Sequence, residues 1–230
     1  MDNQPVYSPW RKYISEPDII TFYAGDECPI VLEKALALEI IDDTTFDYLC
    51  EYLDEDERAA CIAFNSGGEF LPQMSNDWGC IELPSNIGGE VLHAGTGGKP
   101  AADFYVNSWR IPFANESVRV EASMTAAFSA DECSGGPLSL KIWGDEASKI
   151  DNLEPVCVRY KQQVKQQIKE YIQFANEQEE DMKKQESKGK AALKSVRKTS
   201  LGVNGSKFNS QAALARAAAR RAYRAEMAAQ

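Results

Sequence analysis

Histidine is almost absent from this chain, since His93 is the only one among 230 residues. The six cysteines form no C-x-x-C pair and are dispersed over the first 157 residues. Structural zinc sites normally use closely spaced Cys and His ligands, so we expect neither a metal site nor a cofactor. Dispersed cysteines in a chain of this kind are usually small buried apolar residues, and we expect free thiols.

Long apolar runs are also missing. No stretch approaches the roughly 18 continuous apolar residues that span a bilayer. The first ten residues, MDNQPVYSPW, contain no apolar core of a signal peptide. We therefore expect a cytoplasmic protein that has no membrane partner.

Tryptophan and proline are lacking from the C-terminal third. All four Trp precede residue 144, and all ten Pro lie at or before Pro155. After Glu186 the only aromatic residues are Phe208 and Tyr223. This distribution predicts an acidic domain over residues 1–155, which contains most of the core, and a helical extension after it.

Strand-like patterns dominate the middle of that domain. Val118–Phe128 is the clearest, because apolar residues alternate there with more polar ones at a period of two. Such alternation favours an antiparallel sheet with one buried face. Further strands are expected over 18–23, 78–83, 90–94, 104–111 and 138–143.

Two helices are expected in the N-terminal half. One covers residues 31–41, and the second begins after an N-cap at Asp43 or Thr44. Its apolar residues Phe46, Leu49, Cys50 and Leu53 are spaced as one face of a helix. The sequence thus predicts an α+β fold, mainly an antiparallel sheet with two helices, followed by a long amphipathic helix and a basic helical tail.

The extension divides into three parts. Apolar residues from Val156 to Ala175 recur at spacings of three and four, which predicts a long amphipathic helix over 156–186 that packs on the domain or on a copy of itself. Residues 187–209 carry glycines, many lysines and few large apolar residues, as in a flexible basic linker. The Ala/Arg-rich residues 210–230 predict a final helix, which Ser210 is expected to cap.

A glycine-rich stretch at residues 88–100 resembles a phosphate loop only superficially. Counting back from Lys99, His93 stands where that motif needs glycine, and Pro100 stands where it needs Ser or Thr. His93 could act as a general base with Cys80 or Asp103, but no spacing requires this. The carboxylates between Asp42 and Asp54 are more typical of a solvated helix face than of a metal site. We therefore predict no catalytic residue and no enzyme activity.

Charge is the strongest functional signal. Residues 1–160 carry 10 Lys/Arg against 28 Asp/Glu, a net charge of −18, whereas residues 161–230 carry a net charge of +8. From Lys183 onward, 12 basic residues are opposed only by Glu186 and Glu226. Such asymmetry concerns partners rather than fold.

The candidate binding residues follow from this split. The basic set is Lys183, Lys184, Lys188, Lys190, Lys194, Arg197, Lys198, Arg216, Arg220, Arg221 and Arg224. The acidic docking face predicted on the second helix is Asp43, Asp47, Glu51, Asp54 and Glu55.

Three functions fit these residues. The first is assembly, in which the basic arm docks on an acidic surface of another copy or of another protein. The second is sequence-independent binding of nucleic acid by the same arm, with steep salt dependence. The third is imitation of a polyanion by the acidic body, with Tyr48 and Tyr52 adding contact area, to inhibit a nucleic-acid-binding protein.

Overall fold

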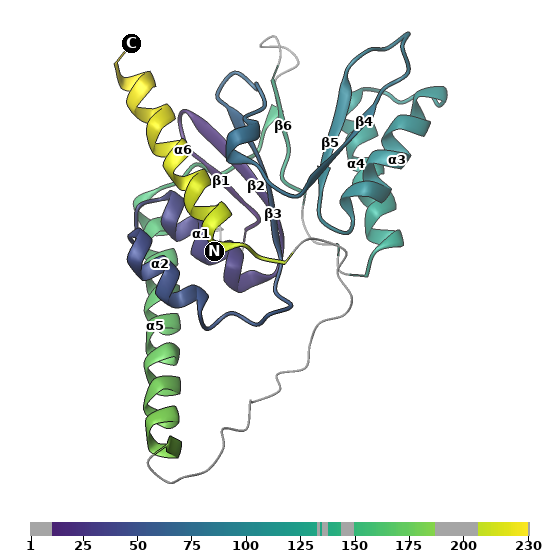
Figure 1. Cartoon of the computed structure of the whole chain (residues 1–230). Helices are drawn as coiled ribbons and strands as arrows, with labels where there is room; N and C mark the ends of the chain where they lie inside the picture. The colour runs from purple at the N-terminus through teal and green to yellow at the C-terminus, as the bar shows by residue number, and fades with distance from the viewer. Residues whose placement is uncertain (1–10, 133, 135–137, 144–149, 187–206, 230) are drawn as a thin grey trace, which may run out of the picture.

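A three-stranded antiparallel sheet lies at the centre of the fold (Figure 1), here in a computed structural model that describes residues 11–132, 134, 138–143, 150–186 and 207–229. Its strands are β1 (Tyr13–Ser15), β2 (Ile19–Gly25) and β3 (Ala59–Asn65), in the order β1-β2-β3. Both β2 and β3 are largely buried because both faces of the sheet are covered. The expectation of a mixed fold with antiparallel sheets is confirmed.

Gly25 fixes one end of the β2–β3 pairing. It pairs with Ala59 and has a φ of 117°, a conformation that side chains rarely adopt. A Cβ atom there would lie 2.3 Å from the carbonyl oxygen of Arg58. Next to it, the Asp26 carboxylate accepts a hydrogen bond of 2.8 Å from the Arg58 backbone N–H. The chain therefore leaves the sheet at Gly25 and enters the first helix directly.

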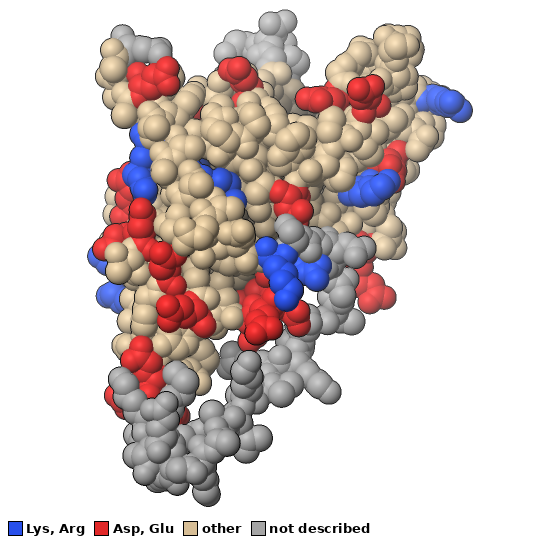
Figure 2. Space-filling view, in the orientation of Figure 1, with Lys and Arg blue, Asp and Glu red and all other residues tan. Residues whose placement is uncertain are grey.

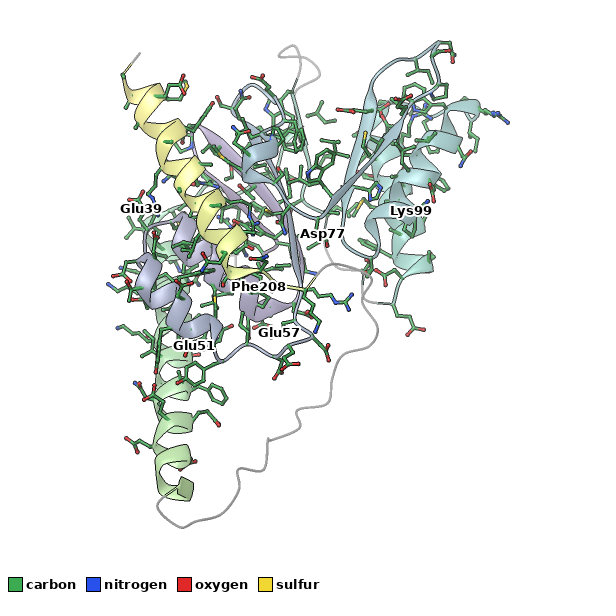
Figure 3. The ribbon with its side chains drawn as sticks, viewed as in Figure 1. Glu39, Glu51, Glu57, Asp77, Lys99 and Phe208 are labelled. Carbon is green, nitrogen blue, oxygen red and sulfur yellow. The ribbon has the colours of Figure 1, made fainter. Side chains whose placement is uncertain are left out.

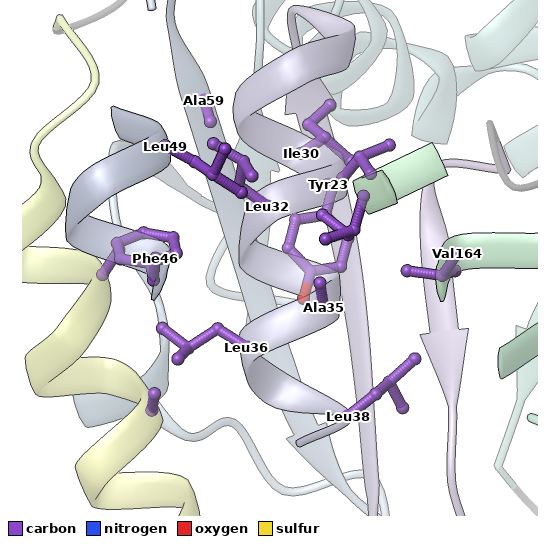
Figure 4. Packing of buried hydrophobic residues seen from close by; sticks show 14 of the residues in the cluster. Tyr23, Ile30, Leu32, Ala35, Leu36, Leu38, Phe46, Leu49, Ala59 and Val164 are labelled. Carbon is purple, nitrogen blue, oxygen red and sulfur yellow. The ribbon is translucent and has the colours of Figure 1, made fainter. Parts of the chain in front are cut away.

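Four helices pack on one face of the sheet (Figure 1): α1 (Glu27–Ala37), α2 (Asp43–Cys50), α5 (Val158–Glu186) and α6 (Ser210–Ala228). Figure 4 shows the core between them, where Tyr23 of the sheet meets Leu32 and Leu36 of α1, with Phe46 and Val164 contributed by α2 and α5. The predicted apolar face of the second helix is confirmed, since Phe46 and Leu49 are buried in this core. The core thus joins residues from both ends of the chain.

Aromatic residues cover the opposite face of the sheet. Tyr13, Ile20 and Leu153 are buried there, with Phe22 and Trp143 packed against them. Two short paired strands, β6 (Lys141–Ile142) and β7 (Ile150–Asp151), flank this cluster.

The middle of the chain forms a separate lobe at the β3 side of the sheet (Figure 1). A 3-10 turn (Pro72–Met74) leads to the hairpin of β4 (Trp78–Glu82) and β5 (Glu90–Ala94). The helices α3 (Gly98–Asn107) and α4 (Glu116–Ala130) follow, separated by a 3-10 turn at Ser108–Arg110. Small or polar residues are buried between these helices, among them Ala102, Ser123 and Ala127.

Two predicted strands are wrong, because this lobe is helical where strands were expected. Residues 118–128 belong to α4, whose buried residues Arg119, Ser123 and Ala127 follow a spacing of four. The Asn115 side chain accepts a hydrogen bond of 3.0 Å from the Val118 N–H and caps the helix. The alternation of apolar and polar residues over 118–128 does not produce a strand, because this segment is rich in alanine and other good helix formers and has an N-cap. Residues 104–111 likewise lie in α3 and the turn after it.

Helix ends also differ from the predictions. The helix expected over 31–41 begins at Glu27 and ends at Ala37, two residues before Glu39, which adopts a φ of 57°. A residue in this left-handed region is a common way to terminate a helix. Asp42 rather than Asp43 or Thr44 caps α2, and Asn209 rather than Ser210 caps α6. No helix in the described ranges has the length and apolar character needed to cross a membrane.

Candidate docking interface of the C-terminal arm

The described C-terminal segment, residues 207–229, is called the arm below, and it packs on the domain that precedes it. Lys207 forms a β-bridge with Arg58, and the Phe208 N–H donates a hydrogen bond of 2.9 Å to the Glu57 carbonyl. The Phe208 ring contacts Phe46 edge to face at 6.2 Å. Figure 3 shows Phe208 at the start of α6 with Glu57 beneath it. The arm is therefore anchored before its helix begins.

Arg216 is the first arginine of α6 to meet a carboxylate. One of its Nη atoms donates a hydrogen bond of 2.5 Å to Glu33 of α1, and the side chains are only 10% and 7% exposed. Burial raises the pKa of Glu33, and the Arg216 charge opposes that rise. A buried pair of this kind gains strong attraction but loses the hydration of both charges.

Arg220 lies one turn further along and is buried. Its Nη1 donates a hydrogen bond of 2.9 Å to the Thr21 hydroxyl of β2, and its Nη2 donates one of 2.5 Å to Glu16. Ala213 and Ala217 are buried on the same side of α6. Their small side chains let the helix approach α1 and the sheet closely, so that the long arginines reach acceptors beneath the helix.

Arg221 and Arg224 form the outer part of the interface. Arg224 donates to Glu16 at 2.6 Å and lies 3.7 Å from Asp18 and 3.5 Å from Glu39. Arg221 makes a bidentate pair with Asp43 at 3.1 and 3.2 Å, and both side chains are exposed. Figure 2 shows acidic and basic side chains next to one another on this side of the molecule. Glu16, Asp18, Glu33, Glu39 and Asp43 together are called the arm-binding surface below.

A small cavity remains beneath α6. Its volume is about 20 Å³, and its walls include Thr21, Glu33, Arg216 and Arg220. The Nε atoms of both arginines are buried and have no hydrogen-bond partner. A cavity of this size is large enough for a single water molecule.

The predicted acidic docking face is only partly where the arm binds. Asp43 pairs with Arg221, and Asp54 and Glu55 line a second cavity of about 230 Å³ with Lys207 and Phe208. Asp47 is half-buried and Glu51 is exposed, and neither takes part in the arginine pairs described above. Tyr48 and Tyr52, expected to offer contact area, donate hydrogen bonds of 3.1 and 3.0 Å to Glu179 of α5.

Most of the basic residues before the arm lie outside the part of the chain that the structure describes. Lys183 and Lys184 belong to the last turn of α5, and their side chains lie outside the described residues. The same holds for the whole of Lys188, Lys190, Lys194, Arg197 and Lys198, and for most of the predicted linker. The structure therefore places only Arg216, Arg220, Arg221 and Arg224 of the predicted basic set.

Sequence reasoning missed four of the five carboxylates on the arm-binding surface: Glu16, Asp18, Glu33 and Glu39. Glu33 carried a usable signal, since it interrupts the apolar run of α1, where a charge requires a partner. Glu16, Asp18 and Glu39 carried none, because they lie in turns that only the fold brings under α6.

The glycine-rich stretch forms a strand, a loop and a helix, and Thr96 in its loop bonds to a carboxylate just after α4. Thr96 and Ser134 donate hydrogen bonds of 2.5 and 2.6 Å to the carboxylate of Asp131. His93 lies opposite Gly79 in the β4–β5 hairpin, with its ring over that glycine. Cys80 pairs with Leu92 and so points to the other face of the hairpin, away from His93. The considered Cys80–His93 pair is therefore not formed.

Burial lowers the pKa of His93, as does the charge of Lys99, whereas Asp103 raises it. Lys99, which is labelled in Figure 3, is itself paired with Asp103 at 2.7 Å. Cys28, Cys50, Cys61, Cys80 and Cys157 are free thiols, and Cys133 lies outside the described residues. Within the described part of the chain, no group of three or more His, Cys, Asp or Glu side chains is placed to hold a metal ion.

No protein-family model, curated protein or solved structure matches this chain. The chemistry of the arm and of the surface beneath it is therefore what points to a function.

Proposed function

We propose that this protein is a non-enzymatic binding and assembly protein whose basic C-terminal arm docks on an acidic protein surface, either of its own copies or of another protein. The observation that carries the proposal is the burial of Arg216 and Arg220 against Glu33 and Glu16. Arginine is suited to such contacts because its planar, weakly hydrated group forms several directed hydrogen bonds.

The form of the arm supports the same proposal. In an Ala-rich helix with arginines on one side, the small alanine side chains allow close approach, and the long cationic side chains reach acceptors on the partner. A helix of about 20 residues is only marginally stable alone, so contact with a surface contributes to its folding. Helices that bind in this way read their partners through residues spaced by three and four, as Arg216, Arg220 and Arg224 are here.

Nucleic-acid binding is the alternative, favoured by the net charge of residues 161–230. With the arm docked, however, the four arginines of α6 face carboxylates, so phosphate would have to displace those carboxylates. The alternative therefore depends chiefly on the basic residues between Lys183 and Lys198. The polyanion-imitating inhibitor is less favoured, since the arm already neutralises part of the acidic surface.

Light-scattering mass of the nuclease-treated full chain tests the proposal, measured at low and high salt and at concentrations up to about 1 mM. We expect association that weakens with salt. We also expect faster hydrogen exchange of residues 210–228 in Arg221→Gln/Arg224→Gln, because docking of the arm is weaker on whichever copy it binds. The matched control is Lys161→Gln/Lys165→Gln, which makes the same charge change at exposed positions of α5.

Equal hydrogen exchange of the arm in both variants would contradict docking through these arginines. A monomer under all conditions would contradict docking on copies of the chain. Titration of the same samples with DNA and RNA would then test the alternative.

A further inference from the structure

The arginines of α6 contact residues that are very distant in the sequence. The pairs from Arg216–Glu33 to Arg224–Glu16 join positions that are 178 to 208 residues apart. The acceptors come from β2, from α1, from the start of α2 and from the turns that join β1 to β2 and α1 to α2. The surface that receives the arm is thus built entirely by a part of the chain far from the arm itself.

We infer that two copies of this chain exchange their α6 helices, each inserting its arm on the arm-binding surface of the other. This inference rests on the proposed function and names its partner. The surface of a second copy offers α6 the same carboxylates, the same Thr21 hydroxyl and the same small-residue contacts. Exchange of an identical element therefore creates no new interface and is a low-cost route to a dimer.

The connection between α5 and α6 sets the balance between docking of the arm on its own chain and exchange with a second copy. Twenty residues, 187–206, separate the end of α5 from the arm, and a chain of that length reaches at most about 70 Å when extended. Linkers of such length give an effective concentration of about 1 mM. The arm therefore stays on its own chain in dilute solution and exchanges where copies are concentrated.

Substituting one partner of a contact cannot test this inference, because exchange keeps every contact. The test must make the arm incompatible with its own chain but compatible with a second one. Two pairs allow this, Arg216–Glu33 and Arg221–Asp43, because their partners are distinct from Glu16, which serves Arg220 and Arg224.

The first variant reverses the arm, Arg216→Glu/Arg221→Asp, and the second reverses the surface, Glu33→Arg/Asp43→Arg. Each full-length variant alone opposes like charges in its own interface. In a mixed dimer with exchanged arms, both interfaces carry opposite charges again. We expect light scattering to give a monomer mass for each variant alone and a twofold mass for the equimolar mixture.

A third chain carrying all four substitutions is the control, since its arm matches its own surface. Hydrogen exchange of residues 210–228 should show protection in that chain and in the mixture, and loss of protection in each variant alone. A mixture that stays monomeric while the third chain protects its arm overturns exchange. Protection of the arm in the two separate variants overturns charge-directed docking, and the proposed function with it.

Discussion

Arg216 of α6 and Glu33 of α1 form a 2.5 Å ion pair across 183 positions of the sequence, with both side chains at most 10% exposed. Removing either partner leaves the other charge buried without compensation. For each of Arg216→Met and Glu33→Leu, we expect a loss of about 3–5 kcal/mol in the docking free energy, enough to release α6.

The double variant Arg216→Met/Glu33→Leu should restore docking to within about 1 kcal/mol of the original chain, because apolar side chains of similar volume avoid the desolvation of both charges. Hydrogen exchange of α6, measured for all four chains of this cycle, gives the coupling free energy. A double variant as poorly protected as the worse single variant would contradict this reasoning.

Two neighbouring arginines of α6 should differ sharply in their contributions. Arg220 is 5% exposed and loses hydrogen bonds to Glu16 and Thr21 when replaced, whereas Arg221 is 42% exposed. We expect Arg220→Met to weaken docking by about 2 kcal/mol or more. Arg221→Met should weaken it by less than about 1 kcal/mol. Hydrogen exchange of the arm measures both, and similar losses would mean that burial does not govern the interface.

Lys34 gives stability an unusual dependence on pH. Its side chain is buried, and burial together with the charges of Arg11 and Lys12 lowers its pKa to about 7. The unfolded chain keeps this proton up to a pKa of 10.5, so above pH 7 it binds more protons than the folded chain. The free energy of unfolding therefore rises with pH, by up to about 2 kcal/mol between pH 7 and pH 8.5.

Urea unfolding across this range, compared with Lys34→Met, isolates the effect of Lys34. The variant should lack the rise. The range ends at pH 8.5 because the thiols of Cys28, Cys50 and Cys61 have raised pKa values and reverse the trend at higher pH. An equal rise in both chains would assign the dependence to another group.

Gly25 should tolerate no side chain. Its φ of 117° and the 2.3 Å approach to the Arg58 carbonyl predict that Gly25→Ala destabilises the fold by more than about 2 kcal/mol. Gly88 is the matched control, since it also has a positive φ, of 74°, but open space around it. Gly88→Ala should lose only about 1 kcal/mol. Thermal or urea unfolding of the two variants distinguishes the close contact from the backbone conformation alone.

Local sequence patterns predicted the elements in which residue spacing and secondary-structure propensity indicate the same structure. The apolar spacing of Phe46 and Leu49 identified α2, and the hairpin strand at residues 90–94 was predicted with its observed bounds. The prediction failed at residues 118–128, where alternation and helix propensity point to different structures. Buried Arg119, Ser123 and Ala127 decide the matter, because α3 offers them a surface at a helical spacing.

The sequence by itself determined the separation of charge and the helical nature of the arm, because composition and propensity are local properties. It also predicted Arg216, Arg220, Arg221 and Arg224 as candidate binding residues. Only the tertiary structure decided what these arginines face. Glu16, Asp18, Glu33, Glu39 and Asp43 form one surface solely because β1, β2, α1 and α2 fold together, and contacts between residues so far apart leave no periodicity in the sequence.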